Sequence, residues 1–393
     1  MSILKKWQKS LILVLAFAVA ILGSAIVTMQ LTRREQTPAE AKTAEIGAYL
    51  DRFFIDDYDE DTLADAAASA MVEATGDRWS YYLTAEEKSS YDEQMQNAYV
   101  GIGVTITAQE ELGGMRIEAV TADGPAEKAG LLTGDIITEV EGEKTLDLGM
   151  TGTRTKVRGE EGTFVTLTIL RGEESFPVSV ERRSIQTPVA TYEVLNGQIG
   201  YLKIANFDSR CAEETNAAMD ELIAQGAQAP VSYTRNNGGG YKNELVKVLD
   251  KILPEGILFQ SEDYQGSKQI DRSDADCIDL PMAVLVNQDS YSAAEFFAAA
   301  IQEYDWGTVV GTKTVGKGNF QTAFTLSDGS MLNLSIGKYY TPQGRSLTDT
   351  GVIPDIEITL SDEDDAKLYY GQLEKADDAQ LQAAIREITQ KLS

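Results

Sequence analysis

Short apolar runs and helix-forming segments alternate along the second half of the chain, and this alternation constrains the fold more than any other feature. The runs IGYLKIANF (199–207), PVSYTR (230–235), MAVLVN (282–287) and GTVVGT (307–312) are typical of buried strands. Helix-forming segments at 211–226, 241–253 and 293–304 separate them. Such alternation indicates helices packed on a largely parallel sheet. We therefore predict a mixed α/β core over residues 184–360.

The regions on either side of this core have a different character. Residues 98–183 contain β-rich runs separated by Gly and acidic turns, with one short helix that Pro125 begins and Gly130 ends. We predict a compact β domain there. Residues 30–97 form a linker and an acidic, helix-prone region in which Thr84 is a helix N-cap. Residues 361–393 are predicted to be a charged helical tail.

The N-terminus carries an apolar run at 11–29 behind three lysines. At 1.5 Å per residue this run extends about 28 Å, enough to cross the hydrocarbon core of a bilayer. Since the sequence after it matches a signal-peptidase site only weakly, we expect an uncleaved signal anchor rather than a removed signal peptide. Residues 1–10 would then be cytoplasmic, and the rest of the chain would lie on the extracytoplasmic side of the cell membrane.

The charge and the rare residues exclude several function classes. The formal net charge of −28 makes nucleic acid a poor partner, because its phosphates would be repelled. The absence of histidine removes Ser-His-Asp triads and His-ligated zinc sites. Acid–base chemistry must therefore use carboxylates, Lys, Tyr or Cys. Cys211 and Cys277 lack metal-ligand spacing, and they form either one disulfide or two buried thiols.

Three polar segments follow predicted strands in the core, where α/β sheets place their sites. In NNGGG (236–240) the glycines let backbone N–H groups face a ligand and stabilise an oxyanion. NQDSYSAAEFF (287–297) places two serines at a helix start, and KTVGKGNFQ (313–321) holds a lysine between glycines. A buried lysine with a lowered pKa is a general base. Each segment has an ordinary reading as a turn or cap, but together they supply a nucleophile, a base and an oxyanion loop.

These segments also carry a family resemblance. RNNGGG, VLVNQDSYSAAE, VGTKTVGKGNFQT, LSDGS and KYYTPQGRSL…GVIPDI resemble, in order, the signatures of the carboxy-terminal processing peptidases, also called tail-specific proteases. YVGIGV, GPAEKAGLLTGDII and GTFVTLTILRG resemble the PDZ domain of that family, and TGDRWSYYLTAEE resembles its N-terminal helical region. The resemblance spans residues 43–360 and implies a crotonase-like α/β core with an inserted PDZ domain at 98–183.

The resemblance implies a role for several residues of the core. Ser292 matches the nucleophile, Lys317 the base and Gln321 the amide that orients the base. The oxyanion donors would be the N–H of Ala293 and that of Gly238 or Gly239. Ser290 would be only a helix-cap residue.

The resemblance also implies how a substrate binds. Gly101, Ile102, Gly103 and Val104 match the PDZ loop that holds a C-terminal carboxylate while the peptide adds as a strand to the sheet edge. Ile102 and Val104 would line an apolar pocket for the last side chain.

Three positions depart from the family pattern. Tyr233 stands where an aspartate is common, Val315 where an aromatic residue is common, and Tyr291 is bulkier than expected beside the nucleophile. Tyr291 would either narrow the pocket or mark a weakened enzyme.

We therefore predict a membrane-anchored serine endopeptidase that needs neither metal nor organic cofactor. Its partners would be unfolded or C-terminal segments of proteins and, through its helical ends, other copies of itself. The alternatives are an inactive relative that binds tails without cutting them and a crotonase-like acyl-CoA enzyme, which would need a CoA site. A chymotrypsin-type PDZ protease is excluded by the missing histidine.

Overall fold

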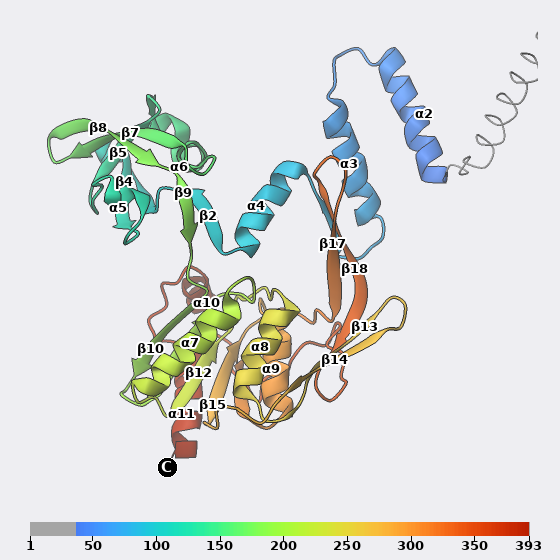
Figure 1. The fold of residues 1–393 in the computed structure, drawn as a ribbon, viewed down its shortest axis with the longest axis vertical. Helices are drawn as coiled ribbons and strands as arrows, with labels where there is room; N and C mark the ends of the chain where they lie inside the picture. Colours follow the sequence, from blue (N-terminus) through green and yellow to red (C-terminus); the bar gives the residue numbers. More distant parts are fainter. Residues whose placement is uncertain (1–36, 393) are drawn as a thin grey trace, which may run out of the picture. The chain divides into compact units, whose positions relative to one another are not determined.

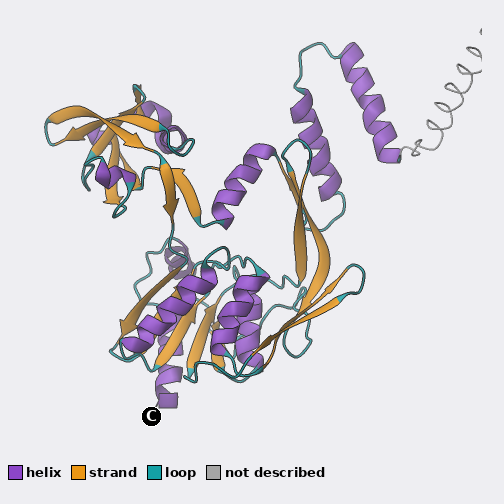
Figure 2. Cartoon of the chain, in the orientation of Figure 1, coloured by secondary structure: helices purple, strands orange, loops and turns teal. Residues whose placement is uncertain are grey.

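The computed structural model describes residues 37–392 (Figures 1 and 2). The chain divides near residue 67 into two compact units, and each is described by itself. The first holds helix α2 (Pro38–Phe53) and the start of α3 (Glu60–Glu73). Within residues 37–392 no helix is long and apolar enough to cross a bilayer. The predicted anchor at 11–29 lies outside the described residues.

The core of the second unit is a six-stranded sheet. Its strand order is β10-β11-β12-β15-β16-β19, and only β10 runs antiparallel to its neighbour. The predicted parallel α/β core is thus confirmed. The strands are β10 (Ala190–Leu195), β11 (Ile199–Ile204), β12 (Ala229–Tyr233), β15 (Met282–Val286), β16 (Gly307–Gly311) and β19 (Ile356–Glu357).

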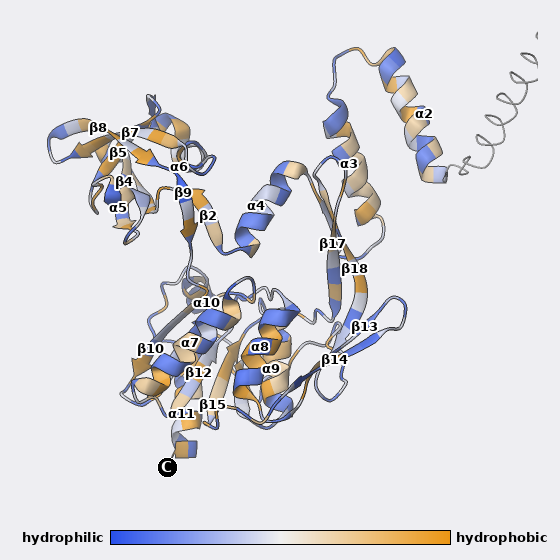
Figure 3. Ribbon diagram, viewed as in Figure 1, coloured by the Kyte–Doolittle hydropathy of each residue, from blue (hydrophilic) through white to orange (hydrophobic). Residues whose placement is uncertain are grey.

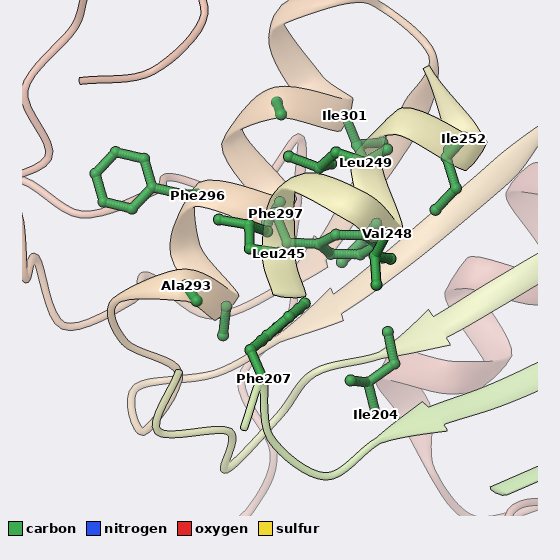
Figure 4. Packing of buried hydrophobic residues seen from close by; sticks show 14 of the residues in the cluster. Ile204, Phe207, Leu245, Val248, Leu249, Ile252, Ala293, Phe296, Phe297 and Ile301 are labelled. Atoms are coloured by element: carbon green, nitrogen blue, oxygen red, sulfur yellow. The ribbon is translucent and has the colours of Figure 1, made fainter. Parts of the chain in front are cut away.

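Helices cover both faces of this sheet. Helices α7 (Cys211–Ala224), α8 (Lys242–Ile252) and α9 (Ala293–Glu303) pack on one face, and Figure 4 shows the side chains of α8 and α9 meeting there. Every residue of α9 from Ala293 to Ile301 is buried, and all of them except Glu295 are Ala, Phe or Ile, as expected for a central helix. Figure 3 shows that β15 is coloured as hydrophobic.

The C-terminal segment is helical, as predicted, and it also forms part of the core. After α10 (Asp362–Tyr369), helix α11 (Ala379–Leu392) buries Leu381, Ala384 and Ile388 against the other face of the sheet. Buried Arg235, three residues before the glycine loop, donates to both carboxylate oxygens of Asp378 and, over 2.6 Å, to Gln380. The start of α11 is thereby tied to the loop after β12.

A second, antiparallel sheet was not foreseen from the sequence. It contains β1 (Tyr81–Leu83), β13 (Gly256–Asp263), β14 (Lys268–Ser273), β17 (Asn319–Thr325) and β18 (Met331–Tyr340). Because β1 pairs with β18, the sheet brings residues near 80 beside residues near 333. Helix α4 (Ala85–Met95) follows β1, and Thr84 caps it as predicted, with Glu87 completing the capping box.

The β domain predicted at 98–183 is present, and its last strand ends at Gln186. Its main sheet has the order β3-β4-β5-β7-β8, so β3 is an edge strand. Helix α5 (Pro125–Lys128) is the short helix expected after Gly124. A second helix, α6 (Thr145–Val157), was not predicted, because its threonines and glycines read as loop or strand. The strands are β2 (Ala98–Gly101), β3 (Val104–Gln109), β4 (Gly114–Val120), β5 (Ile136–Val140), β6 (Glu143–Lys144), β7 (Phe164–Arg171), β8 (Glu174–Glu181) and β9 (Arg183–Gln186); η1 (Glu110–Leu112) links β3 to β4.

Candidate active site

One cavity of about 700 Å³ collects the residues that the sequence singled out in the core. Ser292, Lys317, Gln321, Gly238 and Gly239 all line it, although they come from three separate segments of the chain. The cavity lies beyond the carboxyl ends of β12 and β15, where parallel sheets place their sites. The three weak sequence signals therefore belong to one place.

Ser292 is held in a strained turn between β15 and α9. It has a φ of +58° and a ψ of −125°, a backbone conformation that residues other than glycine rarely adopt. The residue is 7% exposed and stands at the N-cap of α9. A serine on a sharp turn from a strand to a helix presents its hydroxyl beside the unpaired N–H groups of the first helical turn.

Ser290 has a different role from the predicted one. It is fully buried and lies in the turn before the helix, so it does not cap α9. Its hydroxyl donates to the carbonyl of Thr234 over 2.8 Å and accepts from the N–H of Asn287 over 3.0 Å. Ser290 therefore fastens the end of β15 to the segment after β12.

The glycine loop lies directly against this turn. A Cβ on Gly239, whose φ is +87°, would come within 2.7 Å of Ser292 Cβ and 2.8 Å of Ala293 N, so only glycine fits. The N–H of Gly239 already donates to Asn237 Oδ1 over 2.8 Å. Among the described residues no group accepts the N–H of Gly238. Of the two glycines predicted as oxyanion donors, Gly238 is therefore the one with a free N–H, and a Cβ on it would meet the Tyr291 hydroxyl at 2.7 Å.

Glu295 connects the serine turn to the lysine loop, and its part in the site was not predicted. It is fully buried. Its Oε2 accepts from the N–H of Ser292 (2.9 Å) and of Lys317 (2.8 Å), and its Oε1 accepts from the N–H of Gly316 (2.7 Å) and from the Thr314 hydroxyl. Burial raises the pKa of Glu295, and these four donors oppose that rise. The sequence did contain a signal, since Ser292 and Glu295 have the spacing of a capping box.

Lys317 lies in an apolar environment made by two rings. Its Nζ is 4.8 Å from the ring centre of Trp79 and 5.7 Å from that of Tyr291, and the two rings stack on each other. Burial lowers the pKa of Lys317 to about 8, against the attraction of Asp77 and Glu295, which raises it. Within residues 37–392 the structure has no hydrogen bond between Lys317 Nζ and Ser292 Oγ. Apo enzymes often show catalytic pairs before their hydrogen bond has formed.

Gln321 has no hydrogen bond to the amine of Lys317 among the described residues. Its amide donates to Ser335 Oγ over 3.0 Å and to the carbonyl of Asn319 over 3.3 Å. Ser335 in turn bonds the carboxylate of Asp77, which attracts Lys317. In place of the predicted direct hydrogen bond there is an indirect link, in which Gln321 bonds Ser335 and Ser335 bonds the Asp77 carboxylate that attracts Lys317.

The departures from the family pattern lie in different places. Tyr291 lines the cavity and forms one wall of the lysine environment. Tyr233 is buried in the cluster under α11, with Arg235 stacked 4.5 Å from its ring centre, and it does not line the cavity. Val315 is half-buried, and its N–H donates to the carbonyl of Ser290. Only Tyr291 therefore affects the space around the nucleophile.

The predicted carboxylate loop leads into the free edge of β3. Gly101 and Gly103 are buried, and Gly103 has a φ of +77°. The Ile102 side chain is 1% exposed and belongs to the core of the β domain, so it is not an open pocket wall; Val104 is half-buried at the start of β3.

The cysteines and the acidic groups give no sign of a disulfide or a metal centre in the described part of the chain. Cys211 and Cys277 are both free thiols, Cys211 fully buried. Among residues 37–392 no cluster of His, Cys, Asp or Glu side chains could hold a metal ion.

The fold and the site define a serine protease with a PDZ domain. The profile of Peptidase family S41 matches residues 198–358, and that of the PDZ domain matches residues 116–171. A protein of Staphylococcus epidermidis named "Probable CtpA-like serine protease" is 30% identical over 354 residues, which cover 88% of this chain and 72% of the relative. A relative of the same name from Staphylococcus aureus is 29% identical over 365 residues, 90% of this chain and 73% of its own. The chain belongs to peptidase family S41, as the sequence motifs predicted.

A solved structure agrees with this assignment at the level of the fold. A structure from Bacteroides fragilis named "Putative S41 protease" superposes with a TM-score of 0.50 at 18% identity, over 83% of this chain and 90% of its own. The two chains therefore share the fold.

Proposed function

We propose that the protein cleaves peptide bonds with a Ser292–Lys317 dyad. The observation that carries this proposal is the strained Ser292 turn, which shares one cavity with a lysine whose pKa is lowered to about 8 by burial. With no histidine in the chain, this lysine is the base available to the serine. The family membership supports the same chemistry.

The proposed reaction follows the geometry of the cavity. Neutral Lys317 takes the proton of the Ser292 hydroxyl as its oxygen attacks the substrate carbonyl. The N–H groups of Ala293 and Gly238 stabilise the resulting oxyanion, and each well-placed donor contributes about 3 kcal/mol. The amine leaves with a proton from Lys317, and water then hydrolyses the acyl-enzyme. Lys317 must move from the rings of Trp79 and Tyr291 to the hydroxyl when substrate binds.

The PDZ domain is proposed to deliver unfolded C-terminal segments to this site. The free edge of β3 offers unpaired backbone groups to an added peptide strand, and the Gly101–Val104 loop precedes it as in carboxylate-binding loops. Tail binding without cleavage is the second candidate, favoured by the bulk of Tyr291 beside the nucleophile.

The proposed location is the extracytoplasmic face of the cell membrane, with residues 11–29 as a single-pass anchor. The length and apolarity of that run support it. Membrane fractionation of the full chain and of a chain that starts at residue 37 tests this, because only the full chain should resist extraction by carbonate.

Mass spectrometry of an unfolded test protein distinguishes the two functions. Wild-type protein should produce fragments, while Ser292→Ala and Lys317→Ala should produce none. Intact substrate with all three proteins, together with binding to the PDZ domain, would favour the tail-binding function. Near-normal cleavage by Lys317→Ala would show that the base is misassigned.

A further inference from the structure

The cavity is lined by a buried acidic group that the proposed reaction does not use. Asp208 follows β11, is 5% exposed, and lines the same cavity as Ser292 and Lys317. Its carboxylate lies against the glycine loop: a Cβ on Gly240 would meet Asp208 Oδ1 at 2.6 Å. The group is therefore part of the cavity wall next to the proposed oxyanion loop.

Backbone hydrogen bonds fix Asp208 relative to this loop. The N–H of Phe207 donates to the carbonyl of Gly239 over 2.7 Å, and the N–H of Tyr241 donates to the carbonyl of Phe207 over 2.8 Å. The N–H of Asp208 donates to Asn206 Oδ1 over 3.0 Å. Since Gly239 touches Ser292, the Asp208 carboxylate lies within about 12 Å of Ser292 Cβ.

No cation is paired with this carboxylate in the described part of the chain. Lys242 is bound to Asp271 and Arg210 to Glu214, and no hydrogen bond reaches the Asp208 side chain. The titratable groups closest to it are the phenols of Tyr91 and Tyr241 and the thiol of Cys211. Burial raises the pKa of Asp208 to about 7. An unpaired carboxylate in such a place destabilises the fold unless a ligand supplies the missing charge.

We propose that Asp208 forms a subsite for a lysine or arginine side chain of the substrate next to the scissile bond. The inference rests on the proposed peptidase function of the same cavity. A long cationic side chain, on a residue whose carbonyl lies at Ser292, spans the distance to Asp208. The rings of Tyr91 and Tyr241 line the cavity beside Asp208. They can pack against the aliphatic part of the substrate side chain and attract its positive charge.

The test compares quenched fluorescent peptides that differ at one position beside the cleaved bond. That position carries lysine, norleucine or glutamate, so length is kept while charge changes. Wild-type protein should cleave the lysine peptide about tenfold better in kcat/KM than the norleucine peptide, mostly through KM. Asp208→Asn should make kcat/KM for the lysine peptide equal to that for the norleucine peptide, and a cooperative urea unfolding curve shows that the variant is folded.

Asp289→Asn is the matched control, because Asp289 lines the same cavity but is exposed. It should keep the preference for lysine. Equal cleavage of the lysine and norleucine peptides by wild-type protein, or an undiminished preference in Asp208→Asn, would overturn the proposal.

Binding measurements separate this proposal from the proposed catalysis. Fluorescence anisotropy on the Ser292→Ala background measures affinity for the same peptides without turnover. Tighter binding of the lysine peptide that depends on Asp208 would support the subsite even if no peptide were cleaved by the wild type. Equal affinity for all three peptides would refute it independently of any activity.

Discussion

Replacement of Glu295 by glutamine tests whether one buried carboxylate holds the nucleophile turn and the base loop together. Glutamine keeps the shape but has one acceptor oxygen in place of two. Its amide nitrogen fits best toward Thr314, whose hydroxyl can accept, and that placement leaves the N–H of Gly316 without an acceptor. The opposite placement would orphan both Ser292 N–H and Lys317 N–H.

The cost follows from these bonds. One buried N–H without a partner costs about 2 kcal/mol, and three bonds that change from charged to neutral lose about 1 kcal/mol each at most. We expect Glu295→Gln to lower the free energy of unfolding by about 4 kcal/mol, measured by urea denaturation. Because Ser292 and Lys317 would shift relative to each other, kcat should fall about 100-fold.

A control on the same helix distinguishes the site from helix α9 in general. Glu303 accepts from Gln343 N–H (2.9 Å) and Arg345 Nε (3.2 Å) near the far end of α9. Glu303→Gln should leave kcat within about twofold of wild type. If Glu295→Gln kept both wild-type kcat and a free energy of unfolding within about 1 kcal/mol of wild type, the connecting role of Glu295 would be refuted.

Three further predictions concern the same cavity. Because the pKa of Lys317 is lowered to about 8 and the neutral amine is the active form, kcat/KM should rise about tenfold per pH unit below pH 8 and level off above it; a flat profile between about pH 6 and 9 would contradict this. The free energy of unfolding of Ser292→Gly should be about 1 kcal/mol greater than that of Ser292→Ala in urea denaturation. Glycine adopts the positive φ of this position without strain, and this gain exceeds the cost of the greater backbone entropy that glycine gives the unfolded chain. The pKa of Asp208 is about 7 in the folded protein and 3.8 ordinarily. The free energy of unfolding is therefore highest below about pH 4, where the carboxyl is protonated in both states, and it falls as the pH rises through 7. Asp208→Asn should therefore stabilise the protein by up to about 4 kcal/mol at pH 8 and by little at pH 4 in urea titrations, and equal effects at both pH values would argue against a buried charge.

Patterns among neighbouring residues predicted the helices and strands that depend only on those neighbours. The short apolar run at 282–286 and the Ala- and Phe-rich helix that follows it can be identified without any partner. The cap at Thr84 and the helix start at Pro125 were recognised for the same reason. The second sheet was missed because pairing of Tyr81 with Asn333 leaves no trace in either segment alone.

The candidate site shows the same division. Glycine spacing and the serine and lysine segments indicated the chemistry, and the resemblance selected Ser292 over Ser290. The aromatic environment of Lys317 depends on Trp79, which is more than 200 residues away along the chain, so no motif around the lysine contains it. Glu295 was missed because its importance lies in the donors that surround it, and Asp208 because its importance lies in its burial in the cavity wall; both are properties of the folded chain.

The bond between Arg235 and Asp378 has a consequence for the resistance of the protein to its own proposed activity. A peptidase that takes unfolded segments would also take any segment of its own that came loose. Here the last helix is packed on the sheet through Leu381 and Ile388 and fastened at its start by a buried ion pair. To become a strand in a peptide groove, this segment would first have to leave the core that supports the glycine loop. Unfolding of α11, which its cleavage would require, is therefore opposed by the same contacts that keep the core folded.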